Sequence, residues 1–202
     1  INSRIFGGVV ENMVLIAIPM FVFMGLILER SGIAKELLES LKVLTNRTPG
    51  GLAMSVTILG TIMAATTGII GASVVMISLM AFPVMLAAGY EKSFSSGTIA
   101  AAGTLGILIP PSIMLVVMGD LLSISVTDLF MTALVPGLML ATLYIIYIFL
   151  KCRKHFKFNQ NDTNSDKSIT RIIMRGFLPA TILIMLILGS IFSGLATPTE
   201  AA

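Results

Sequence analysis

The segment from Gly103 to Ser112, GTLGILIPPS, interrupts an apolar run that is long enough to cross a bilayer. Pro110 and Pro111 have no backbone N–H to donate, and their rings clash with the preceding helical turn. Lipid cannot satisfy the carbonyls that such a break frees, so broken backbone at membrane depth persists only where protein buries it or where it lines a wet cavity. Secondary transporters bind substrate and ions at broken helices of this kind. The segment therefore predicts that the chain is part of a transporter.

The composition indicates an integral membrane protein. The chain is 56% apolar and 11% charged, whereas soluble domains carry about 25% charged residues. The net charge of +3 comes from basic residues between apolar segments, not from a basic stripe or arm, which argues against nucleic acid as a partner. A single cysteine excludes a disulfide framework. Because the chain begins with Ile and ends inside a motif, we expect it to be a piece of a longer polypeptide.

The order of apolar and polar segments predicts an all-α membrane protein that combines transmembrane helices with a re-entrant helical hairpin. The hairpin is expected because small and hydroxylated residues fill the centre of its apolar block and no charged turn separates its arms. Pro83 is expected to break its second arm, and residues 91–96 to form a polar loop. The predicted parts are a first span (1–30), an amphipathic arm helix (31–51), the hairpin (52–90), a broken helix (91–119), a second span (120–150), a cytoplasmic loop (151–176), and a span with the start of a second hairpin (177–202).

The distribution of basic residues predicts the orientation. Cytoplasmic loops are enriched in Lys and Arg, and the loop at 151–176 is the most basic part of the chain. When the spans are counted back from this loop, Arg4 is the one basic residue that falls outside. The first hairpin then opens from the cytoplasm and the unfinished segment after Gly194 enters from the other face. Re-entrant elements that enter from opposite faces are expected of inverted repeats.

The centre of the first hairpin and the broken helix supply the candidate ion- and substrate-binding residues. Hydroxyls and unwound carbonyls can coordinate Na⁺, and the N-termini of half-helices can face an anionic substrate. The alternatives are close helix packing by small residues and hydroxyls that bond back to their own helix. The candidates are Thr66, Thr67, Gly68, Gly71 and Ser73 in the hairpin, and Gly103, Thr104, Pro110, Pro111 and Ser112 in the broken helix.

The segment TPTE at residues 197–200 follows the last span. Thr197 can cap a helix that starts at Pro198, with Glu200 completing a capping box; this does not exclude the entry of a second hairpin, so Thr197, Thr199 and Glu200 remain candidates. No charged residue lies deep in an apolar segment, which favours sodium over proton coupling. Catalytic motifs and intramembrane bases are lacking, so we do not expect an enzyme.

Motifs along nearly the whole chain are shared with one family. They are IPMFVFMG (18–25), ERSGIA (29–34), PGGLA (49–53), PVM and GY (83–85, 89–90), GTLG (103–106), IPPS (109–112), LF and PG (129–130, 136–137) and GLATPTEAA (194–202). Together they resemble the large membrane subunit of the tripartite ATP-independent periplasmic (TRAP) transporters. The hairpin tip departs from the Ser-Gly-Ser type that many members have.

The resemblance implies sodium-driven import of small organic acids (carboxylates) by an elevator motion, in the inner membrane of a bacterium or archaeon. A periplasmic binding protein would deliver the substrate and a small membrane subunit would accompany this one. Na⁺, the coupling ion, is implied near Thr67, Ser73 and Thr104, and no other cofactor is expected. Two alternatives are an ion-coupled inverted-repeat carrier without a binding protein and a non-transporting membrane scaffold.

Overall fold

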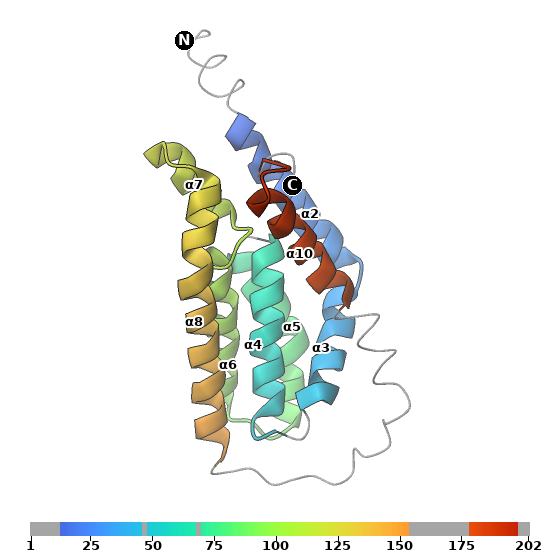
Figure 1. The fold of residues 1–202 in the computed structure, drawn as a ribbon. Helices are drawn as coiled ribbons and strands as arrows, with labels where there is room; N and C mark the ends of the chain where they lie inside the picture. The colour runs from blue at the N-terminus through green and yellow to red at the C-terminus, as the bar shows by residue number, and fades with distance from the viewer. Residues whose placement is uncertain (1–12, 46–47, 68–69, 154–177, 198–202) are drawn as a thin grey trace.

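A computed structural model describes residues 13–45, 48–67, 70–153 and 178–197, and these ranges contain helices and no strand (Figure 1). The starts of the first span and of the second hairpin lie partly outside them, as does most of the predicted loop at 151–176. The helices are α2 (Met13–Arg30), α3 (Ile33–Thr45), α4 (Gly51–Thr67), α5 (Ile70–Ala87), α6 (Lys92–Thr104), the short 3₁₀ helix η2 (Leu105–Ile107), α7 (Ile113–Leu122), α8 (Val126–Arg153) and α10 (Leu178–Phe192).

The helices α4 and α5 form an antiparallel pair at the centre of the fold (Figure 1). Helix α6 packs against both of them, α3 covers α4 from the other side, and α8 runs alongside α4. A second apolar cluster joins α2, α7, α8 and α10 around the buried Phe21 and Phe130. The central pair therefore provides the surface on which the broken helix rests.

Within the predicted arm-helix segment at residues 31–51, the structure has the helix α3. Ala34, Leu37, Leu38 and Leu41 are buried in the main apolar cluster, together with side chains of α4. The charged side chains between them are exposed, as expected for an amphipathic helix. The hydroxyl of Thr45 donates to the carbonyl of Gly51 at 2.8 Å and ties the end of α3 to the start of α4.

Two expectations about helix boundaries are wrong. Pro83 lies inside α5 and does not end it; it is exposed, and membrane helices tolerate the loss of one backbone bond where local adjustment compensates. Residues 92–96 belong to α6 and not to a loop. Here the serine and threonine hydroxyls donate to carbonyls of their own helix, for example Ser95 to Glu91 at 3.0 Å and Thr98 to Phe94 at 2.8 Å, so polar composition did not prevent helix formation.

Helix α8 is the one helix in the described ranges that is long and apolar enough to cross a bilayer by length and composition. Pro136 lies within it without ending it. Large apolar side chains such as Val135, Met139 and Leu150 are exposed along its length. Shorter apolar helices of 10–17 residues lie in α2, α4, α5, α7 and α10.

Gly50 is expected to tolerate substitution much less than Gly89. Both have a positive φ, of 74° and 84° respectively, which costs an L-residue about 1–2 kcal/mol. A Cβ at Gly50 would also lie 2.8 Å from the Cβ and Sγ atoms of Cys152, whereas nothing lies within 4 Å of one at Gly89. Overpacking should add about 1–3 kcal/mol for Gly50→Ala. Thermal unfolding of the full-length permease in detergent would measure the difference, and equal shifts for the two variants would contradict it.

Candidate ion and substrate site

Between residues 91 and 119, where a broken helix is predicted, the structure has two helices, α6 and α7, separated by an irregular segment. Helix α6 ends at Thr104, and the N–H groups of Leu108 and Ile109 both donate to the carbonyl of Leu105 at 3.0 Å. Pro110 and Pro111 follow, both buried and joined by a cis peptide bond. Helix α7 begins after Ser112, which has extended backbone. The lost N–H donors of the two prolines explain why α6 and α7 do not form one helix.

Small residues hold the end of α6 against the hairpin. A Cβ built on Gly103 would lie 2.2 Å from Cγ2 of Val74 in α5, and one on Gly60 of α4 would lie 2.5 Å from Cβ of Ala102. Real Cβ atoms essentially never approach other atoms this closely. The two glycines therefore let α6 approach both arms of the hairpin more closely than any larger residue would allow.

The other side of the break rests on α8. A Cβ on Gly137 would lie 2.9 Å from Cγ1 of Ile109 and 3.1 Å from the carbonyl oxygen of Leu108. Ile109 and Leu105 are buried in a small cluster with Ala141 of α8. The irregular backbone is thus enclosed between the hairpin and α8, which is the condition under which a bilayer tolerates it.

The hydroxyl of Ser112 is the one buried side-chain polar atom without a hydrogen-bond partner in the part of the chain that the structure describes. Ser112 is fully buried. Its carbonyl accepts from the N–H of Val116 at 3.2 Å, but its side chain does not cap α7. An unsatisfied buried hydroxyl costs about 1–3 kcal/mol. A hydroxyl can donate to a carboxylate or offer lone pairs to a cation, and at the N-terminus of α7 the helix dipole favours an anion.

Two further candidate hydroxyls lie near this region. Ser73 of α5 is 2% exposed and precedes Val74, the residue that Gly103 contacts. Thr104 is exposed, and its hydroxyl donates to the carbonyl of Ala101 at 2.8 Å. The hydroxyl proton of Thr104 therefore bonds back to its own helix, which is one of the two alternatives to ligand binding. The hydroxyl oxygen keeps lone pairs that could coordinate a cation. Gly71 is exposed at the start of α5.

The structure gathers only part of the predicted set. Gly103 meets α5 beside Ser73, while the buried prolines and Ser112 lie at the other end of the break. Thr197 is exposed beyond α10, after a turn at Gly194. Gly68, Pro198, Thr199 and Glu200 lie outside the described residues, as do the side chains of Thr66 and Thr67.

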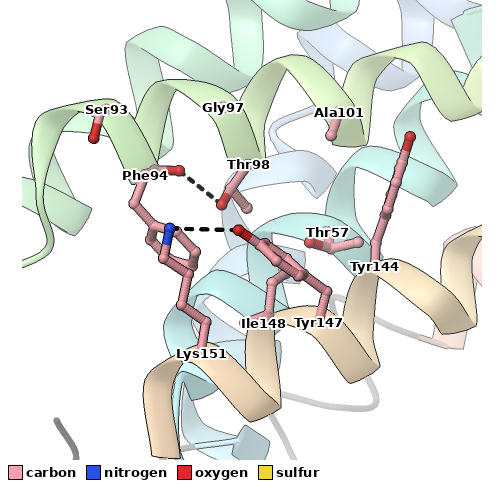
Figure 2. A pocket seen from close by; sticks show the side chains of 10 residues that line it. All are labelled: Thr57, Ser93, Phe94, Gly97, Thr98, Ala101, Tyr144, Tyr147, Ile148 and Lys151. Carbon is pink, nitrogen blue, oxygen red and sulfur yellow. Dashed lines mark hydrogen bonds between the residues drawn. The ribbon is translucent and has the colours of Figure 1, made fainter. Parts of the chain in front are cut away.

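The chemistry available at the break is that of hydroxyl and carbonyl oxygens. Within the described residues no group of three or more His, Cys, Asp or Glu could hold a metal ion. Oxygen donors without a charged cluster suit a hard monovalent cation, of the kind that unwound transporter helices coordinate. A cavity does form in the described region, but between α6 and α8, and none of the predicted site residues lines it (Figure 2).

Sequence reasoning missed the close packing that positions the break. Gly60 and Ala102 were not among the candidates, although they bring α4 and α6 together. An isolated glycine within a helical pattern is a signal of close approach, and Gly60 sits in the middle of α4. In the sequence, Gly137 stands out only as part of a motif. Its close contact with Ile109 depends on where α8 packs.

A helix broken at its centre, buried against the α4–α5 pair and accompanied by further apolar helices, fits a membrane permease. The family model described as "Tripartite ATP-independent periplasmic transporter, DctM component" matches residues 1–202. The chain belongs to this family, which consists of integral membrane transport proteins, and the resemblance read from its motifs is confirmed.

Several named permeases are similar to the chain. It is 33% identical over 199 residues to the C4-dicarboxylate TRAP transporter large permease protein DctM of Pseudomonas aeruginosa, covering 95% of this chain and 44% of that protein. It is 33% identical over 196 residues to the isethionate TRAP transporter permease protein DctMQ of Oleidesulfovibrio alaskensis (96% and 30% covered). It is 32% identical over 194 residues to the 2,3-diketo-L-gulonate TRAP transporter large permease protein YiaN of Escherichia coli (95% and 44%). The chain spans less than half the length of these relatives.

Proposed function

We propose that the protein containing this chain imports small organic acids by coupling them to Na⁺, as the large permease of a tripartite transporter. A periplasmic binding protein delivers the substrate, a small membrane subunit completes the permease, and the complex lies in the inner membrane. The observation that carries the proposal is the buried, unpartnered hydroxyl of Ser112 at the N-terminus of α7, in a helix break enclosed by protein.

The substrate in this proposal is an anion bound at the break. The N–H groups of the first turn of α7 and the hydroxyl of Ser112 are donors that suit a carboxylate. Two relatives are named for C4-dicarboxylate and 2,3-diketo-L-gulonate, which are carboxylates. Na⁺, as the co-transported ion, would be held by hydroxyl and main-chain oxygens near Ser73, Gly103 and Thr104, and its charge would offset that of the substrate.

The movement in this proposal is that of an elevator. The glycine contacts of Gly60 with Ala102 and of Gly103 with Val74 interlock α4, α5 and α6. Tightly packed interiors transmit displacement instead of absorbing it. The hairpin and α6 would therefore move as one body, with the ion and the substrate carried at its edge.

The test is uptake of radiolabelled organic acids into proteoliposomes that hold the full-length permease with its small subunit. Uptake should require both an inward Na⁺ gradient and the binding protein outside. Uptake that needs Na⁺ but not the binding protein would replace the tripartite assignment with a self-sufficient carrier. If no organic acid enters under a Na⁺ gradient while the binding protein binds one, the proposal fails.

A further inference from the structure

A cavity of about 450 Å³ lies between α6 and α8, and Figure 2 shows the side chains that line it. Thr57 of α4 lines part of this cavity, and the other lining residues belong to α6 and α8. Gly97 leaves open space on the α6 side of the cavity, because nothing lies within 4 Å of a Cβ built there. The cavity is thus a groove between helices and is separate from the site proposed for substrate.

The groove combines apolar walls with one cation. Phe94, Tyr144 and Ile148 supply apolar surface, and the hydroxyl of Thr98 is already bonded to the carbonyl of Phe94. At one end, the ammonium of Lys151 lies 5.1 Å from the ring centre of Phe94 and 5.7 Å from that of Tyr147 (Figure 2).

The contacts of the Lys151 ammonium do not neutralise its charge, so the ammonium can bind an anion. Its ammonium donates to the hydroxyl of Tyr147 at 3.4 Å, and within the described residues it pairs with no carboxylate. The carboxylate of Glu91, the residue before α6, accepts a hydrogen bond from the hydroxyl of Ser93 at 2.6 Å. An apolar slot that ends in an unneutralised ammonium fits a long apolar chain with an anionic head.

The position of the groove along the helices fits one source of such a ligand. Lys151 lies in the last turn of α8, together with Arg153, the end that the distribution of basic residues assigns to the cytoplasm. The cytoplasmic leaflet carries the anionic phospholipids of the membrane, and basic pockets between membrane helices on this side bind their headgroups. Tyr144 and Tyr147 are the amphipathic side chains that favour this depth.

We propose that the groove between α6 and α8 binds an anionic phospholipid, with its phosphate against Lys151 and an acyl chain along Phe94, Tyr144 and Ile148. The lipid is a structural ligand of the permease and not a transported substrate. The inference rests on the inner-membrane location in the proposed function and on the orientation that the basic residues predict. Filling the groove would seat α6, which precedes the helix break, against α8 at the membrane surface.

The test is native mass spectrometry of the full-length permease, titrated with phosphatidylglycerol or with phosphatidylcholine of the same acyl chains. Wild type should bind phosphatidylglycerol more tightly. Lys151→Gln should weaken that binding about fivefold and leave phosphatidylcholine binding unchanged. Arg153→Gln is the matched control. It removes the same charge from a position two residues further along α8, and the Arg153 side chain does not line the groove. Equal binding of the two lipids to wild type, or equal losses in the two variants, would overturn the proposal.

A second variant tests the groove itself. Gly97→Leu fills open space on α6 without changing charge and should reduce binding of both lipids while preserving the melting temperature. Unchanged lipid binding in this variant would overturn the proposal. None of these readouts requires transport, so failed uptake with intact lipid selectivity would reject the proposed function alone.

Discussion

Replacing Ser112 with alanine is expected to stabilise the full-length permease and, at the same time, to reduce its sodium-dependent uptake. The hydroxyl is buried and has no partner in the described structure, so removing it relieves a desolvation penalty of about 1–3 kcal/mol. A hydrogen bond to a charged ligand contributes about 1.5–3 kcal/mol, which corresponds to a roughly ten- to hundredfold loss of transport efficiency. Thermal unfolding in detergent and initial uptake rates in proteoliposomes measure the two effects.

The opposite signs of these effects make the result specific. Ser96→Ala on α6 is the matched control, because the Ser96 hydroxyl is exposed and donates to the carbonyl of Ser93 at 3.1 Å; both readouts should stay close to wild type. If Ser112→Ala lowers the melting temperature and uptake together, the hydroxyl has a structural partner. If uptake is retained, Ser112 does not contact the ligand, and the observation that carries the proposed function is lost.

Replacing Gly103 with alanine is expected to abolish most uptake by displacing α6 from the hairpin. The new Cβ would lie 2.2 Å from Cγ2 of Val74, and overpacking costs about 1–3 kcal/mol. The better helix propensity of alanine returns up to about 1 kcal/mol, so the net loss of stability should be small. The displacement matters more, because a shift of about 1 Å at a binding site can cost on the order of a hundredfold. Uptake rates and thermal unfolding should therefore diverge.

A compensating change identifies the cause. Val74→Ala removes Cγ2, after which the nearest atoms to the new Cβ are Cβ and Cα of residue 74, at 3.3 and 3.4 Å. The double variant Gly103→Ala with Val74→Ala should recover most of the uptake that Gly103→Ala loses, which a double-mutant cycle would record as coupling. Gly97→Ala, on the same helix with open space around it, is the neutral control. Additive losses in the cycle would contradict the proposed contact.

The helix break and the arm helix could be predicted because their causes are local. Pro110 and Pro111 lack N–H donors wherever they are placed, and the helical spacing of Leu37, Leu38 and Leu41 needs one face buried. The same local reasoning failed at Pro83 and at residues 92–96. There, exposure of the proline and back-bonding of hydroxyls to the helix, neither of which composition reports, allowed the helices to continue.

The sequence predicted which residues belong to the candidate site, but not how their atoms are arranged. Ser112 and Gly103 were chosen for their motifs, but the motifs do not indicate that the Ser112 hydroxyl is buried without a partner or that Gly103 lies against Val74. Lys151 was assigned to a cytoplasmic loop, whereas its ammonium lies over Phe94, more than fifty residues earlier in the chain.

Residue chemistry along the chain was thus enough to indicate the membrane class, the family and the place where the helix breaks, because each depends on composition, motifs or missing donors. The contacts of Gly60 with Ala102, Gly103 with Val74 and Gly137 with Ile109 depend on helices that are distant in sequence. So do the isolation of the Ser112 hydroxyl and the groove at Lys151. Only tertiary packing decides these features, because a side chain's partners and its access to solvent are properties of the surfaces that folding brings together.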